Sequence, residues 1–136
     1  MPDIPDTREG ALATLHALLA SGLTLRLYAN PVKPSRELTA ASFVEASFPG
    51  YAAIPLPERL WSVEPGRGNT PPAAYAPYQS FRRSSTGEPE YIHGWYLTDG
   101  AGRLVNWEPV PDGPWDVVRA VDAVQIRPGL VGRMGE

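Results

Sequence analysis

Proline interrupts this chain of 136 residues at sixteen positions, and the prolines separate short apolar segments rather than forming a tract of their own. Because proline lacks a backbone N–H, it is excluded from most helix interiors and from central strands. Short strands joined by many turns are compatible with this spacing. Hydrophobic residues make up 43% of the chain, enough to build a core without a disulfide or a metal. The spacing therefore predicts a single β-rich domain.

A helical pattern occurs once, near the N-terminus. We expect residues 1–6 to be a flexible leader and Asp6 and Glu9 to form a capping box. Apolar residues at helical spacing follow, which predicts a helix over residues 7–21. One face of this helix is apolar and requires a cover, either the domain's own sheet or a neighbouring subunit. Leu15 and Leu19 lie on that face and are candidate interface residues.

After this helix the apolar period changes to two, which is typical of strands with one buried face. The most regular alternation lies at 91–98, and Asp99–Gly102 then predicts a hairpin loop with an antiparallel return over 104–108. Further short strands are predicted at residues 23–29, 51–56 (at a sheet edge), 60–63, 74–82 (interrupted by Pro77) and 120–127.

These segments predict an all-β fold: an antiparallel β-sandwich or small barrel of about seven short strands with an N-terminal helix. The β-rich domain is expected to span residues 23–127, and residues 128–136 are expected to form a tail.

Charge and cysteine content exclude several classes of protein. The net charge is −3, and Arg82-Arg83 is the only adjacent basic pair, so we expect no direct contact with nucleic acid. The absence of cysteine excludes disulfides and thiolate metal sites. The first ten residues are acidic and contain proline, unlike a signal peptide, and no apolar run is long enough to cross a bilayer. We therefore predict no membrane partner.

The sequence contains no arrangement typical of a catalytic or metal site. His16 and His93 have no carboxylate at ligand spacing, so no metal or other cofactor is predicted. Asp112 and Asp116 flank Trp115, and a carboxylate pair beside an aromatic ring could serve a glycoside hydrolase. Acidic residues in Pro-Asp-Gly-Pro segments are usually turn formers, however. We predict that the protein is not an enzyme and assign no catalytic residue.

The aromatic residues are the strongest functional signal. Trp95, Tyr96, Trp107 and Trp115 lie on or beside predicted strands, and all four are candidate interface residues. Because Trp95 and Tyr96 are adjacent, they are predicted to face opposite sides of a sheet. Such side chains could fill a core, form a protein interface or stack on sugar rings. All three interpretations remain open at this point.

Two segments support a resemblance to a known group of proteins. Leu25–Pro34 reads Leu-Arg-Leu-Tyr-Ala-Asn-Pro-Val-Lys-Pro, and Ala41–Tyr51 reads Ala-Ser-Phe-Val-Glu-Ala-Ser-Phe-Pro-Gly-Tyr. Together with Trp61, the strand segment His93–Tyr96 and the hairpin from Asp99 to Trp107, they are similar to a family of small phage and prophage proteins. The resemblance covers about residues 23–110.

The resemblance implies a non-enzymatic structural component of a phage particle. Capsid decoration, a head or tail accessory role and fibre attachment are all compatible with it. Its partners would be other virion proteins, such as a major capsid or tail protein, and copies of itself in a homo-oligomer. Its location would be the virion, after assembly in the host cytoplasm. An alternative is a carbohydrate- or receptor-binding β-module that presents exposed aromatic residues.

Overall fold

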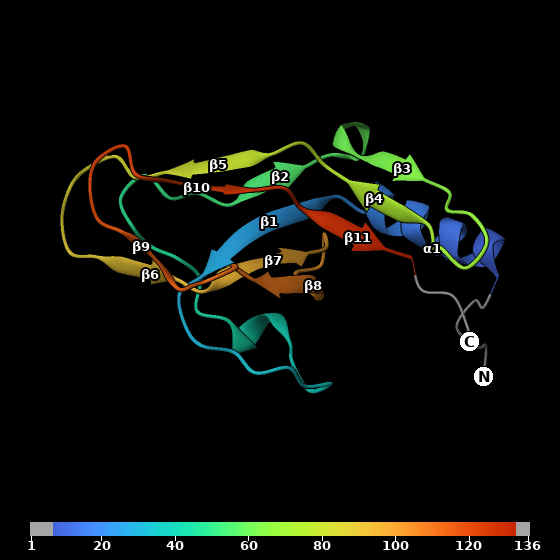
Figure 1. Ribbon diagram of the computed structural model, residues 1–136, viewed down its shortest axis with the longest axis horizontal. Helices are drawn as coiled ribbons and strands as arrows, with labels where there is room; N and C mark the ends of the chain where they lie inside the picture. Colours follow the sequence, from blue (N-terminus) through green and yellow to red (C-terminus); the bar gives the residue numbers. More distant parts are fainter. Residues whose placement is uncertain (1–6, 133–136) are drawn as a thin grey trace.

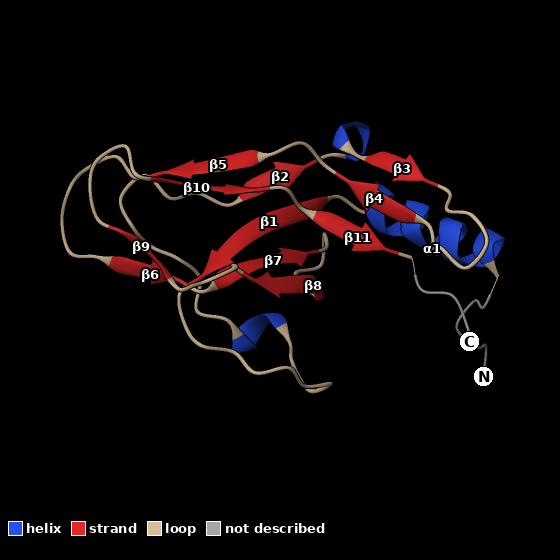
Figure 2. Cartoon of the chain, viewed as in Figure 1, coloured by secondary structure: helices blue, strands red, loops and turns tan. Residues whose placement is uncertain are grey.

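Residues 7–132 are described by the computed structural model, and these residues are mostly β with one α-helix at the N-terminal end (Figures 1 and 2). They contain eleven strands in four antiparallel sheets. The strands are β1 (Leu23–Tyr28), β2 (Ile54–Leu56), β3 (Ser62–Glu64), β4 (Ala73–Tyr75), β5 (Gln79–Arg82), β6 (Glu90–Ile92), β7 (Gly94–Thr98), β8 (Leu104–Pro109), β9 (Trp115–Val117), β10 (Ala123–Ile126) and β11 (Gly129–Val131). The predicted β-rich class with an N-terminal helix is confirmed.

The helix α1 (Arg8–Ala20) lies one residue inside the predicted limits at each end. Its N-cap is Thr7, whose hydroxyl accepts the Gly10 N–H at 3.0 Å, so the N-cap lies one residue after the predicted Asp6, and Gly10 has no side chain to complete a capping box. Asp6 itself and the predicted leader 1–6 lie outside the described residues. The helix covers one end of the sheets (Figure 1).

The largest sheet has the order β2-β1-β7-β8 and is antiparallel throughout. Strand β2 is at its edge, as its prolines predicted. The second layer is built from two pairs of strands, β4 with β11 and β5 with β10, and β3 joins it on the far side of β4 (Figure 2). The arrangement is sandwich-like, and the sheets formed by residues 7–132 do not close into a barrel.

Proline residues explain part of the difference between about seven predicted strands and eleven observed ones. The segment predicted as one strand over 74–82 is divided at Pro77 into β4 and β5. Its antiparallel partner is divided at Pro128 into β10 and β11, and the Ala76 N–H donates to the Pro128 C=O across the break. The two breaks therefore lie opposite each other, and the register changes by one residue across them, since Gln79 pairs with Ile126 whereas Tyr75 pairs with Gly129.

The tail predicted from residue 128 is wrong for residues 129–131, which form β11. Leu130 is 5% exposed and belongs to the core. Strand β11 is fixed by its pairing with β4 and by the side chain of Asn106, which donates to the Gly129 C=O at 3.0 Å. Residues 133–136 of the predicted tail lie outside the described residues.

The main core lies between the two layers and under α1. It combines apolar residues from the helix, from β1 and β7, and from the opposite layer: Leu15, Leu19, Leu23, Leu25, Leu27, Leu56, Trp61, Phe81, Trp95, Leu97, Val124, Ile126 and Leu130 are among its members. Burial of this apolar surface is the dominant favourable contribution to folding.

Candidate functional site

Strand β1 separates two apolar clusters because its side chains alternate between the faces of its sheet. Leu25 and Leu27 pair with Leu97 and Trp95 of β7 and face the main core. Tyr28 faces the other side, where it forms a second cluster with side chains from β7, β8 and a long connection. We call this second set the outer aromatic cluster, which consists of Tyr28, Phe43, Tyr96 and Trp107.

The rings of the outer aromatic cluster are in direct contact. Phe43 stacks on Tyr96 with 4.7 Å between ring centroids and meets the edge of Tyr28 at 4.9 Å. Trp107 lies 5.8 Å from Phe43 and 6.3 Å from Tyr28. Such aromatic pairs contribute beyond the area that they bury. The cluster therefore closes the outer face of the sheet with a second, smaller core.

A connection from β1 to the 3-10 turn η1 (Ala40–Ser42) covers this outer face. In Figure 1 it is the loop that passes below β7 and β8. Asn30 holds its two ends together: its side-chain amide donates to the Ser42 C=O at 3.2 Å and accepts the Val44 N–H at 2.8 Å. Val32 and Leu38 of this connection pack on the aromatic cluster.

A polar network lies beside the outer aromatic cluster. Arg26 Nη1 lies 3.1 and 3.2 Å from the two carboxylate oxygens of Glu45, and Arg26 Nε donates to Thr98 Oγ1 at 3.1 Å. The Tyr51 hydroxyl donates to Glu45 Oε2 at 2.6 Å and accepts the Leu27 N–H at 3.1 Å. Burial, followed by the hydrogen bond to Glu45, raises the pKa of Tyr51 far above its usual value. The phenol therefore remains protonated and acts as a fixed donor.

Four of the six candidate interface residues belong to the chain's own cores. Leu15 and Leu19 are 2% and 1% exposed, so α1 packs on the domain's own sheets rather than presenting these residues to a neighbour. Trp95 and Tyr96 face opposite sides of the sheet, as predicted, but both are buried because the outer aromatic cluster covers the second face. These four side chains are not available to a partner in this structure.

The other two candidates, Trp107 and Trp115, are half-buried and remain in reach of a partner. Trp107 lies at the rim of the outer aromatic cluster on β8. Trp115 donates its indole N–H to the Pro111 C=O at 3.0 Å and lines a polar depression of about 540 Å³ between β9 and β10.

Asp112 and Asp116, the possible catalytic pair, do not line a common site, and Glu90 binds backbone N–H groups. Asp112 is exposed in a turn at φ 53°, and Asp116 lies in the depression that Trp115 lines, whereas Asp112 does not line it. Glu90 accepts the N–H groups of Ser47 and Phe48 at 2.8 and 3.0 Å. The structure therefore gives no support to joint action of Asp112 and Asp116.

Two further aspartates hold turns. Asp99 accepts the N–H groups of Ala101 and Arg103, each at 2.9 Å, in the predicted hairpin loop. Asp122 accepts the Val118 and Arg119 N–H groups at 3.1 and 2.8 Å. These backbone hydrogen bonds, led by those from Arg103 and Arg119 respectively, lower the pKa of both carboxyl groups. Both side chains therefore act as ionised turn formers.

Arg83 has a structural role that the sequence did not reveal. It is 3% exposed, and its guanidinium donates to three carbonyl groups, those of Ser85, Glu88 and Val117, at 2.6 to 2.8 Å. Its neighbour Arg82 is exposed. Arg83 directly follows β5, so continued strand alternation would have placed the two side chains on opposite faces, but no local signal indicates which carbonyl groups Arg83 reaches.

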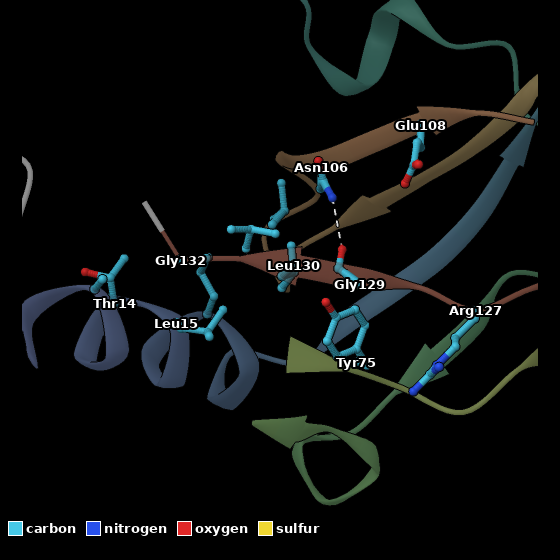
Figure 3. A pocket seen from close by; sticks show the side chains of 13 residues that line it. Thr14, Leu15, Tyr75, Asn106, Glu108, Arg127, Gly129, Leu130 and Gly132 are labelled. Atoms are coloured by element: carbon cyan, nitrogen blue, oxygen red, sulfur yellow. Dashed lines mark hydrogen bonds between the residues drawn. The ribbon is translucent and has the colours of Figure 1, made fainter. Parts of the chain in front are cut away.

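A pocket of about 510 Å³ lies between α1, β4, β8 and β11 (Figure 3). Leu15, Leu18 and Leu130 are among the apolar residues that line it, while Glu108 and Arg127 are its charged residues. Arg127 lies over the ring of Tyr75, with 5.2 Å from its guanidinium carbon to the ring centroid. Figure 3 shows the Asn106 side chain reaching across the pocket to the backbone of β11.

Over residues 7–132 the structure contains no group of three or more histidine or acidic side chains that could hold a metal ion. The same part of the chain has no helix long and apolar enough to cross a membrane.

The residues that carry the phage-protein resemblance have packing and hydrogen-bonding roles. Asn30 closes the connection, Phe43 fills the outer aromatic cluster, and Glu45 and Tyr51 form the polar network. Gly94 is required because a Cβ there would lie 2.2 Å from the Glu108 C=O and 2.5 Å from the Tyr28 ring. The side chains of this pattern that are named here are thus used in packing and hydrogen bonding within the chain.

Comparison with known proteins adds no relative: no protein-family model, no curated protein and no solved structure matches this chain.

Proposed function

We propose that this chain is a non-enzymatic structural component of a phage particle, a capsid decoration or a head or tail accessory protein that binds a protein lattice. The observation that carries the proposal is the role of the residues that resemble the phage-protein family. Glu45, Tyr51 and Asn30 form hydrogen bonds within the chain, as expected of a rigid body that binds by its surface. An enzyme would instead direct such groups into a cleft.

Charge and surface support the same assignment. A net charge of −3 without a basic stripe favours contact with protein over contact with the genome. The large exposed apolar residues among 7–132 are Val44, Tyr78, Tyr91, Val121 and Val131. The proposed partners are a major capsid or tail protein and further copies of this chain, and the proposed location is the virion after assembly in the host cytoplasm. At finer detail than the sandwich-like arrangement, we propose a two-layer β-sandwich as the rigid body.

The test is co-purification with particles. Phage particles from the organism that carries this sequence would be banded by density and analysed by quantitative mass spectrometry. We expect this chain in the particle band at many copies per particle. Its presence in the lysate together with its absence from the banded particles would contradict the proposal.

A second candidate function is carbohydrate or receptor binding, and one observation favours it. Trp115 is half-buried and lines the 540 Å³ depression together with Asp116 and Arg119. An aromatic face beside polar groups is typical of sugar-binding sites. A glycan array tests it: binding that is lost in Trp115→Ala and retained in Tyr78→Ala, an exposed aromatic outside the depression, would support this alternative.

A further inference from the structure

Strand β8 is the longest strand at a sheet edge among residues 7–132. It has six residues and pairs only with β7. Each other strand at an edge within these residues has three or four, and β2 contains Pro55. Short strands and prolines protect sheet edges from pairing with another chain. Strand β8 itself ends in Pro109, and its pairing with β7 shifts register between Leu97 and Thr98, so its regularly paired segment is 106–109. Its length nevertheless makes the edge of β8 the one best able to accept a further strand.

The hydrogen bonds to β7 show which backbone groups of β8 point away from it. The Val110 N–H donates to the His93 C=O, and the register pairs Glu108 with Trp95. Because hydrogen-bonded and non-bonded positions alternate in an antiparallel pair, the N–H and C=O of Trp107 face outward. The C=O of Pro109 faces outward as well. These outward-facing N–H and C=O groups can form hydrogen bonds with the backbone of another extended strand.

The β8 edges of two copies of the chain match each other when they are paired antiparallel with Trp107 at the centre. In an antiparallel pair of two β8 strands centred on this residue, the two Trp107 backbones exchange both hydrogen bonds and their half-buried indoles lie side by side. The same register places Asn106 opposite Glu108 of the other copy, so no like charges meet. In this register Pro109, which has no N–H, lies opposite Val105 of the other copy. A register one step further would place the two Glu108 side chains opposite each other and Pro109 opposite Trp107 itself.

The surroundings of the edge favour a protein partner over water. The pocket between α1, β8 and β11 opens beside it, and its apolar rim includes Val131, which is 65% exposed. Pairing across β8 would bring the two pockets, one from each copy, toward the same interface.

From these relationships we propose that β8 is the self-association edge of this protein and that a second copy pairs with it antiparallel, centred on Trp107. The two four-stranded sheets would become one continuous sheet across the dimer. The inference rests on the proposed function only in that a particle component is present in many copies, and it names the contact between two of them.

Cysteine cross-linking tests both the partner and the register, since the chain has no cysteine of its own. Asn106→Cys and Glu108→Cys would be prepared separately and then mixed under mild oxidation. Residues at a non-hydrogen-bonded antiparallel pair have Cα atoms about 4.5 Å apart, within the range that a disulfide spans. We expect a cross-linked dimer in the mixture and little in either variant alone.

Tyr78→Cys is the matched control, because Tyr78 is 68% exposed and lies outside β8. Dimer formation at the level of this control in the mixture would overturn the proposal. Equal cross-linking of Asn106→Cys alone would overturn the proposed register. Circular dichroism of each variant establishes that it is folded.

A charge pair gives a second, independent measurement. Asn106→Lys places a cation opposite Glu108 of the other copy, and Asn106→Glu places an anion there. Both variants lose the hydrogen bond to Gly129, so that loss cancels in the comparison. With two such pairs per dimer, we expect dissociation constants about tenfold apart by analytical ultracentrifugation, with Asn106→Lys the tighter. Equal constants, or monomers throughout, would overturn the proposal, while particle attachment is read separately by co-purification.

Discussion

The Tyr51 hydroxyl lies between a carboxylate and a strand: it donates to Glu45 Oε2 at 2.6 Å and accepts the Leu27 N–H at 3.1 Å. The Tyr51 oxygen thereby gives the Leu27 N–H of β1 a hydrogen-bond partner at a position beyond the segment of β1 that pairs with β2. It also joins the main core, where the Tyr51 ring stacks on Phe81 with 5.6 Å between centroids, to the polar network on the outer face.

Tyr51→Phe is expected to lower the free energy of unfolding by about 2 kcal/mol, since the half-buried Glu45 carboxylate and the Leu27 N–H lose their partner while the ring stack remains. Urea unfolding followed by tryptophan fluorescence measures the change. Tyr78→Phe, at a 68% exposed position, is the control and should leave stability within about 0.5 kcal/mol of the parent. Similar effects of the two substitutions would contradict the role assigned to Tyr51.

Gly94→Ala is expected to destabilise the protein by about 3 kcal/mol, because the added methyl group would overlap the Glu108 C=O and the Tyr28 ring. Gly102→Ala is the comparison: its Cβ meets nothing within 4 Å, and only the backbone conformation at φ 82° opposes it. That strain should cost about 1 kcal/mol. Thermal unfolding of both variants tests the order, and a larger loss for Gly102→Ala would refute the packing argument.

Arg83→Met and Arg82→Met should differ sharply although the residues are adjacent. Arg83 donates to three carbonyl groups from a buried position, so we expect its replacement to cost about 3 kcal/mol. Arg82 is exposed, and its replacement should cost less than about 0.5 kcal/mol. Chemical denaturation gives both values. A small loss for Arg83→Met would show that the loop from 84 to 89 holds its shape by other contacts.

Val121→Gly is expected to stabilise the protein by about 1 kcal/mol. Val121 is β-branched, 68% exposed and held at φ 71°, a region that such residues rarely adopt. Glycine removes the strain, and little packing is lost at an exposed site. Val44→Gly is the control because Val44 is also exposed and is not at a positive φ, so it should be destabilised. A lower melting temperature for Val121→Gly than for the parent would contradict the expectation.

Stability should fall as the pH rises from about 10 to about 12. Burial raises the pKa of Tyr28 from its usual 10.0 to about 12, and burial also raises the pKa of Tyr96. Over this interval the unfolded chain loses the phenolic proton while the folded chain keeps it, so deprotonation favours unfolding. The contribution is complete below pH 10 and is lost through the folded pKa.

Denaturant unfolding at pH 9 and pH 11 measures this loss, and Tyr28→Phe should reduce it relative to the parent protein. Tyr91→Phe, at a 52% exposed position, is the control and should leave the pH dependence unchanged. An equal pH dependence in the parent and in Tyr28→Phe would show that Tyr28 does not contribute.

The candidate site shows where sequence reasoning reaches its limit. Alternation predicted correctly that Trp95 and Tyr96 face opposite sides of a sheet, but it could not indicate whether either face is covered. The cover of the outer face comes from Phe43, on a connection that returns to the sheet after a proline-containing loop. Burial of Tyr96 thus depends on a contact across more than fifty positions of the chain.

The elements predicted correctly are those whose sequence signals are local. The helix over Arg8–Ala20, strand β1 and the hairpin of β7 and β8 follow from apolar periodicity and turn residues only a few positions apart. Tertiary structure alone decided that β11 pairs with β4, that Leu15 and Leu19 face the protein's own core, and that the β8 edge has no neighbour within residues 7–132. The physical reason is that periodicity records which side of an element is apolar, whereas burial and strand pairing depend on which distant segment packs there.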